Sequence, residues 1–127
     1  MEYGVCEISF RSGNKTVEKL LYKRNLIFLS VINVEEIFCG LAAKNAQRQM
    51  AWFEEFIENH CEVLPITHTI SKRAGTLCGD LRRRGEIRTQ ADLLIASTAL
   101  EYDLILATRN VKDFTQCGLV VHNPFES

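Results

Sequence analysis

The chain has 127 residues and a mass of 14.5 kDa. This length is enough for one domain with its own core and too short for two, so we expect a single domain over residues 1–127. Hydrophobic residues make up 46% of the sequence and charged residues 24%, which is an ordinary globular composition. The net charge of -1 excludes a strong overall basic field, so any nucleic acid would have to bind to a local patch.

The cysteines and the apolar stretches exclude further classes of protein. The five cysteines are odd in number and none is spaced as Cys-x-x-Cys, which argues against a disulfide framework and a zinc site. The longest apolar stretch, residues 26–34, contains Asn33 and is much shorter than a membrane span. Since the opening residues do not resemble a secretory signal, we expect a cytoplasmic protein that does not enter a membrane.

In the first half of the chain, the hydrophobic spacing predicts alternating helices and strands. Residues 15–22 have the spacing of a short helix, and the nearly unbroken apolar run over residues 26–31 is typical of a strand buried on both faces. Asn33 is a candidate cap for a helix that ends at Gly40, and a second helix is expected over residues 45–59.

The second half of the chain continues this alternation. A short strand over residues 63–66 is interrupted by Pro65, and a helix is expected over residues 69–84. Residues 90–100 are apolar almost all round, which predicts an interior helix packed on the sheet. The order of the elements predicts an α/β sandwich with a mostly parallel sheet. The remaining elements are a short strand over residues 103–107, a polar connection over residues 108–115 and a last short strand over residues 119–121.

Three acids that follow or begin apolar elements are candidates for a shared site, namely Glu36, Asp92 and Asp113. In a parallel α/β sheet, ligands gather outside the carboxyl ends of the strands, where the loops after Leu29 and Leu106 should emerge. Carboxylate oxygens suit Mg²⁺ or Mn²⁺, and such an ion would favour hydrolysis of a phosphodiester. Taken singly, Asp92 is equally explained as a helix-dipole partner, Asp113 as a turn residue and Glu36 as a solvated helix charge.

Three segments, in one order along the chain, resemble the motifs of a known family. They are SVINVEEIFCG at residues 30–40, QADLLIASTAL at 90–100 and LATRNVKDF at 106–114. They are similar to PIN-domain ribonucleases of the VapC type, the toxins of bacterial and archaeal toxin-antitoxin pairs, and the likeness extends from about Asn14 to Phe125. The resemblance implies a three-layer α/β/α fold, RNA cleavage that depends on Mg²⁺ (or Mn²⁺), a homodimer, and inhibition by a cognate VapB-type antitoxin that inserts a segment into the acidic groove.

The resemblance also implies roles for individual residues. Glu36 corresponds to the family's helix glutamate, Asp92 to the aspartate before its L-I-A segment, and Asp113 to the aspartate before phenylalanine. These three would be the catalytic and metal-binding acids. Thr108 and Asn110 match the polar residues of the T-R-N motif, which support the site.

The amino terminus departs from the family pattern. The family begins with a strand that runs into L-D-T-N or L-D-T-C, whose aspartate is a central metal ligand, and the opening MEYGVCEISFR contains no convincing copy of it. Glu2 and Glu7 are the acids available to substitute. We therefore expect the first strand to be degenerate or missing, with its slot filled by residues 3–6, by a rearrangement, or by a strand borrowed from a partner.

Basic and aromatic residues are the remaining candidates for contacts with RNA. Arg84 belongs to a basic helix end, and Arg109 and Lys112 flank the Asp113 turn, so we expect these three to contact RNA phosphates. A solvated charged face is the common alternative for such a group. Trp52 lies next to phenylalanines and is better explained by the core or a dimer contact than by base stacking.

Two hypotheses from different classes follow. The leading one is a metal-dependent endoribonuclease that acts as the toxin of a toxin-antitoxin pair. The alternative is a truncated or inactive relative of the same fold, which binds an antitoxin or dimerises with intact relatives, and the missing L-D-T segment favours it. A third hypothesis, a small nucleotide-binding α/β protein, lacks the Gly-rich phosphate loop that it would need.

Overall fold

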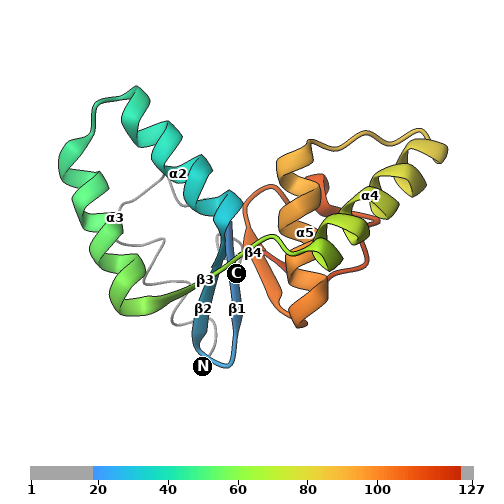
Figure 1. The fold of residues 1–127 in the computed structure, drawn as a ribbon. Helices are drawn as coiled ribbons and strands as arrows, with labels where there is room; N and C mark the ends of the chain where they lie inside the picture. Colours follow the sequence, from blue (N-terminus) through green and yellow to red (C-terminus); the bar gives the residue numbers. More distant parts are fainter. Residues whose placement is uncertain (1–18, 124–127) are drawn as a thin grey trace.

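A computed structural model describes residues 19–123 of the chain (Figure 1). A five-stranded sheet lies between two pairs of helices. Helices α2 (Val31–Ala43) and α3 (Gln47–His60) cover one face, and helices α4 (His68–Arg83) and α5 (Gln90–Tyr102) cover the other. The expected three-layer α/β/α class is therefore confirmed. Within residues 19–123, no helix is long and apolar enough to cross a membrane.

The sheet has the strand order β3-β2-β1-β4-β5 and is mixed. Strands β2 and β3 are parallel, as are β4 and β5, but the central strand β1 runs antiparallel to both of its neighbours. The sheet is thus less parallel than the sequence suggested, and the direction of one strand accounts for the difference. The five strands are β1 (Lys19–Lys23), β2 (Leu26–Ser30), β3 (Cys61–Leu64), β4 (Ile105–Thr108) and β5 (Val121–His122).

Strand β1 corrects the part of the predicted helix, residues 15–22, that the structure describes, namely residues 19–22. Its three central residues, Leu20, Leu21 and Tyr22, are all fully buried. Successive side chains of a strand point to opposite faces, so an unbroken apolar run fits a central strand that is covered on both sides. Strand β1 occupies the central slot of the sheet, while residues 3–6, which were expected as one way to fill it, lie outside the described residues.

A tight turn explains why β1 is antiparallel to β2. Arg24 and Asn25 join the two strands, and both have a left-handed backbone, with φ of 52° and 66°. A two-residue connection with positive φ at both positions is the type I′ turn, whose twist matches that of an antiparallel hairpin. The register continues from it, pairing Lys23 with Leu26 and Tyr22 with Ile27.

Helix α2 follows β2 without a loop, and its first turn is closed by a capping box. The Ser30 hydroxyl accepts a hydrogen bond from the backbone N–H of Ile32 at 3.0 Å. In return, the Asn33 side-chain oxygen accepts one from the Ser30 N–H at 2.8 Å. The cap is therefore Ser30, not Asn33 as expected, and the helix runs past Gly40 to Ala43.

The other elements lie within about two residues of their predicted positions. The main shift is in β3, which was expected over residues 63–66 and is found at Cys61–Leu64. Pro65 has no N–H to offer to the ladder, so the strand ends directly before it. The polar connection after β4 contains a turn of 3₁₀ helix, η1 (Val111–Phe114), which carries Asp113.

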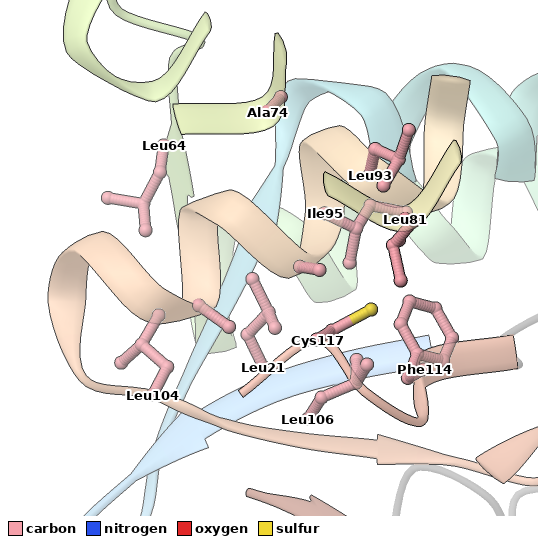
Figure 2. Close-up of a cluster of buried hydrophobic side chains, with 12 residues drawn as sticks. Leu21, Leu64, Ala74, Leu81, Leu93, Ile95, Leu104, Leu106, Phe114 and Cys117 are labelled. Atoms are coloured by element: carbon pink, nitrogen blue, oxygen red, sulfur yellow. The ribbon is translucent and has the colours of Figure 1, made fainter. Parts of the chain in front are cut away.

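The core consists of two apolar layers, one on each face of the sheet. Figure 2 shows the layer under α4 and α5, where Leu21 and Leu106 from the sheet meet Ile95 of α5 and Leu81 of α4. Phe114 packs into the same cluster and is almost fully buried. These contacts fix the amino-terminal end of α5 and the η1 turn against the sheet.

Candidate functional site

The strand directions bring several elements together at one edge of the sheet. Lys19, the first residue of β1, pairs with Thr108, the last residue of β4. At this edge β2 ends at Ser30 and passes directly into α2. Helix α5 contributes Asp92 from its first turn. Residues that are distant in the sequence therefore meet where β2 and β4 end.

Two acids at this edge share one ammonium group. The Lys19 Nζ atom lies 3.0 Å from Asp92 Oδ1 and 3.3 Å from Glu36 Oε1. The side chains of Lys19 and Asp92 are only 15% and 12% exposed, whereas that of Glu36 is 36% exposed. The cluster is thus largely screened from bulk water, which strengthens its electrostatic interactions.

The environment of Lys19 keeps its amine charged. Burial alone would lower the pKa of Lys19, but the hydrogen bond and the negative charge of Asp92, together with those of Glu36, outweigh it. The pKa of Lys19 is therefore raised above its ordinary value. At neutral pH this position holds a cation that belongs to the protein itself.

The capped first turn of helix α5 fixes the backbone of Asp92. The hydroxyl of Thr89, the residue that caps the helix, accepts a hydrogen bond from the backbone N–H of Asp92 at 3.1 Å. The middle of the helix, including Ile95 and Ala96, is fully buried against the sheet and α4. The carboxylate therefore projects from a rigid element, in the first turn where the helix dipole favours negative charge.

Of the two neighbouring acids in α2, only Glu36 belongs to the cluster with Lys19. Glu35 is exposed, whereas Glu36 is partly buried and pairs with Lys19. The flanking residues Asn33 and Ile37 are buried, so this side of the helix faces the protein.

Thr108 and Asn110 shape the connection that carries the third predicted acid. Thr108 is fully buried, and its hydroxyl accepts a hydrogen bond from the backbone N–H of Asn110 at 3.1 Å. The Asn110 carbonyl then accepts one from the N–H of Asp113 at 3.1 Å. These contacts link Thr108 and Asn110 to the backbone of Asp113, and the supporting role implied for both residues stays a prediction.

Arg88 also organises this connection through hydrogen bonds to its backbone. Its Nε donates to the Asp113 carbonyl at 2.9 Å, and its Nη2 lies within 3.4 Å of both oxygen atoms of Thr115. A further bond joins Nη1 to Glu86 at 3.0 Å. Arg88 therefore ties the η1 turn to the loop that leads into α5.

The structure assembles two of the three predicted acids around one cation. Glu36 and Asp92 meet at Lys19, and among residues 19–123 no three side chains of His, Cys, Asp or Glu form a group that could hold a metal ion. Asp113 is partly buried in the η1 turn, outside any such group. Glu2 and Glu7, the candidates to replace the missing aspartate, lie outside the described residues.

The residues in this arrangement do not fit Mg²⁺. That ion needs close to octahedral coordination by oxygens at about 2.0–2.1 Å. Here the space shared by the Glu36 and Asp92 carboxylates is taken by the positively charged Lys19 amine. The ammonium also neutralises one of the two negative charges that would attract a divalent cation. The same objection applies to Mn²⁺.

The basic residues predicted to contact RNA lie on the surface. Arg109 and Lys112 are exposed on either side of Asn110, and Arg84 is exposed at the end of α4. Arg84 Nη1 donates to the side chain of Gln116 at 3.1 Å, which links α4 to the segment after η1. Contact of these residues with RNA stays a prediction.

Lys19 was missed because the prediction placed it in a helix. The nearest signal is a lysine directly before the apolar triplet Leu20, Leu21 and Tyr22, but this triplet fits a short helix as well as a buried strand, so it does not locate Lys19.

Comparisons with known proteins agree with the three-layer α/β/α fold. The family model "PIN domain" matches residues 8–117. The chain is 31% identical over 106 residues to VapC ribonuclease Y4jK of Sinorhizobium fredii, which covers 79% of this chain and 76% of that protein. It is also similar to the crystal structure of VapBC2 from Rickettsia felis bound to a promoter DNA fragment, with a TM-score of 0.72, 23% identity and coverage of 95% of this chain and 94% of that one. The structure of VapBC-1 from Haemophilus influenzae gives a TM-score of 0.73 at 24% identity, with coverage of 94% of this chain and 85% of that one.

Proposed function

Because this chain belongs to the PIN-domain family, we propose that it is the toxin component of a VapBC-type toxin-antitoxin pair and an endoribonuclease that hydrolyses RNA phosphodiester bonds. The match of the family model to most of the chain supports the proposal, as do relatives named as VapC ribonucleases. In this proposal Glu36, Asp92 and Asp113 are the catalytic acids, and Thr108 and Asn110 position the Asp113 turn.

The observation that carries the proposal is the meeting of Glu36 and Asp92. They come from helices on opposite faces of the sheet, yet both reach the same ammonium group within 3.3 Å. A helix-dipole role would account for Asp92 alone, and solvation would account for Glu36 alone. Neither explains why two acids converge at the edge where α/β proteins place their ligands.

A divalent metal is the expected cofactor of such a site, and Mg²⁺ or Mn²⁺ remains our prediction for the active form. With the Lys19 ammonium within 3.3 Å of both acids, the described arrangement does not fit the ion. Activity therefore requires that Lys19 leaves the pair. RNA would lie across the same edge, with its phosphates against Arg84, Arg109 and Lys112.

Cleavage of a labelled single-stranded RNA tests the proposal. We expect cleavage in Mg²⁺ or Mn²⁺ that is abolished by EDTA and by Asp92→Asn. The matched control is Asp103→Asn, which changes an acid at the other end of α5 whose side chain is 96% exposed. Cleavage that survives both EDTA and Asp92→Asn would remove the metal-nuclease proposal.

The proposed partners are a VapB-type antitoxin and a second copy of the chain. The support is that solved structures with this fold include VapBC2 from Rickettsia felis and VapBC-1 from Haemophilus influenzae. Co-expression with a VapB-type antitoxin, followed by co-purification, tests the first partner. Light scattering of the isolated protein tests the homodimer, and a monomeric mass at micromolar concentration would contradict it.

Lys19 favours a second candidate function, a relative without catalysis that binds the antitoxin or dimerises. Such a protein would not need metal between Glu36 and Asp92, and here the Lys19 ammonium lies between these two acids. The two candidates separate in one experiment, because the noncatalytic protein binds antitoxin but leaves RNA intact at every metal concentration tested.

A further inference from the structure

We propose that Lys19 is an internal counter-ion that takes the position of a divalent cation between Glu36 and Asp92, so that the protein completes its acidic site without metal. Metal binds at this pair only once the ammonium is removed or displaced. The inference rests on the proposed function insofar as it treats Glu36 and Asp92 as acids of the nuclease site.

The first support is the geometry of the contacts. The ammonium has one carboxylate at 3.0 Å and a second at 3.3 Å, which are distances for charge-assisted hydrogen bonds or close ion pairs. The two carboxylates come from α5 and α2, so the lysine links the helical layers across the sheet edge. A surface lysine that pairs by chance would not be expected to satisfy two partly buried acids at once.

The second support is the direction of β1. In an antiparallel central strand the first residue, not the last, lies at the edge where β2 and β4 end, and that residue is Lys19. Its place is fixed by pairing on both sides, with Leu21 opposite Phe28 on β2 and opposite Leu106 on β4. A slip of one residue would turn Lys19 to the other face of the sheet, away from Asp92 and Glu36, so the observed register decides which acids Lys19 contacts.

The third support is electrostatic competition. A divalent cation placed between Glu36 and Asp92 would meet an ammonium group already within 3.3 Å of both acids. Like charges at this separation repel strongly in a partly buried site. Without the ammonium, two carboxylates would share the same space uncompensated, which is the arrangement that favours a hard cation.

Binding of Mn²⁺ to the full chain tests the inference. Binding is measured by calorimetry and by the loss of the electron paramagnetic resonance signal of free Mn²⁺. In the absence of RNA, we expect no saturable binding to the unmodified protein at submillimolar Mn²⁺. Lys19→Met keeps most of the side chain but removes the charge, and we expect it to bind Mn²⁺ at least about tenfold more tightly. Lys19→Arg, which keeps the charge, should behave like the unmodified protein.

The matched control is Lys23→Met, because Lys23 is the same residue type on the same strand but at its opposite end. It should leave Mn²⁺ binding unchanged. Adding Asp92→Asn to Lys19→Met should cancel the gain, which locates the new site at the acid pair. Equal, saturable binding by the unmodified protein and by Lys19→Met would overturn the inference.

A second measurement covers the case in which Lys19→Met does not fold. The melting temperature of the unmodified protein and of Asp92→Asn is followed in Mn²⁺, and we expect the ion to shift both equally. A larger shift for the unmodified protein would show that Asp92 binds metal with Lys19 present, against the inference. RNA cleavage separates this outcome from the proposed function: a Lys19→Met protein that gains Mn²⁺ but cuts no RNA contradicts only the proposed function.

Discussion

The two ends of strand β1 carry the same residue type in contrasting surroundings. Lys19 is 15% exposed and contacts two acids, whereas Lys23 is 42% exposed and lies 3.9 Å from Asp103, which is almost fully exposed. Ion pairs at the surface contribute about 0–1 kcal/mol, but removal of one partner from a buried pair costs about 3–5 kcal/mol. The comparison teaches that burial at the sheet edge, rather than the presence of a partner, decides what a lysine on this strand contributes.

The largest expected effect is that of Lys19→Met on stability. The substitution leaves Asp92 and Glu36 as two partly buried carboxylates without a cation, so we expect the free energy of unfolding to fall by about 2–3 kcal/mol, below the full cost because Glu36 is partly exposed. Urea unfolding followed by circular dichroism at pH 7 measures the change. A loss no larger than that of Lys23→Met would mean that the contrast between the two ends does not hold in solution.

The pH dependence of this effect sharpens the comparison. The pKa of Lys19 is raised in the folded protein, because the pairing with Asp92 and Glu36 outweighs the lowering by burial. Its contribution is therefore complete below the pKa of an unfolded lysine, about 10.4, and is lost as the pH rises through the folded-state value. The stability difference between the unmodified protein and Lys19→Met should be constant from pH 7 to about 10 and then shrink. A difference that grows above pH 10 would contradict this.

Arg88 is a third case, a mostly buried cation that bonds neutral oxygens of Asp113 and Thr115 as well as the carboxylate of Glu86. Arg88→Met removes the bonds to Asp113 and Thr115, and we expect a loss of about 1–3 kcal/mol in the free energy of unfolding. The matched control is Arg83→Met, because Arg83 is exposed and pairs with Asp80 on its own helix. Similar losses for the two variants would show that the clamp does not stabilise the turn.

The smallest expected effect is that of Lys23→Met. Its pair with Asp103 is exposed and long, so the free energy of unfolding should change by no more than about 0.5 kcal/mol. Chemical denaturation beside the Lys19 variants gives the measurement. A loss above about 1 kcal/mol would require an interaction of Lys23 other than this surface pair.

The fold was largely predictable because most elements carry their own pattern. The apolar run of β2 and the spacing of α5 identified both within a few residues. Strand β1 was not predictable, since the triplet Leu20, Leu21 and Tyr22 fits the buried side of a short helix as well as a central strand. Only tertiary contact, the covering of both faces, decides between them.

The site was predictable in part, because two of its residues lie in local sequence motifs. Glu36 and Asp92 were identified from motifs at the ends of apolar elements, and the structure brings them together. A shared site that includes Asp113 remains a prediction. Lys19 was out of reach because its place depends on the direction of β1, which no local pattern states. Arg88 acts on a turn that lies far along the chain, so its spacing gave no hint of that role.

The turn at Arg24 and Asn25 has a consequence for how the chain folds. It closes the pairing of β1 with β2 over two residues, whereas the pairing of β1 with β4 joins distant parts of the chain. Short loops close fastest, so this hairpin can form within microseconds and provide a template on which later segments assemble. Lys19 would then lie in the β1–β2 hairpin before α5 packs on the sheet and brings Asp92 close to it.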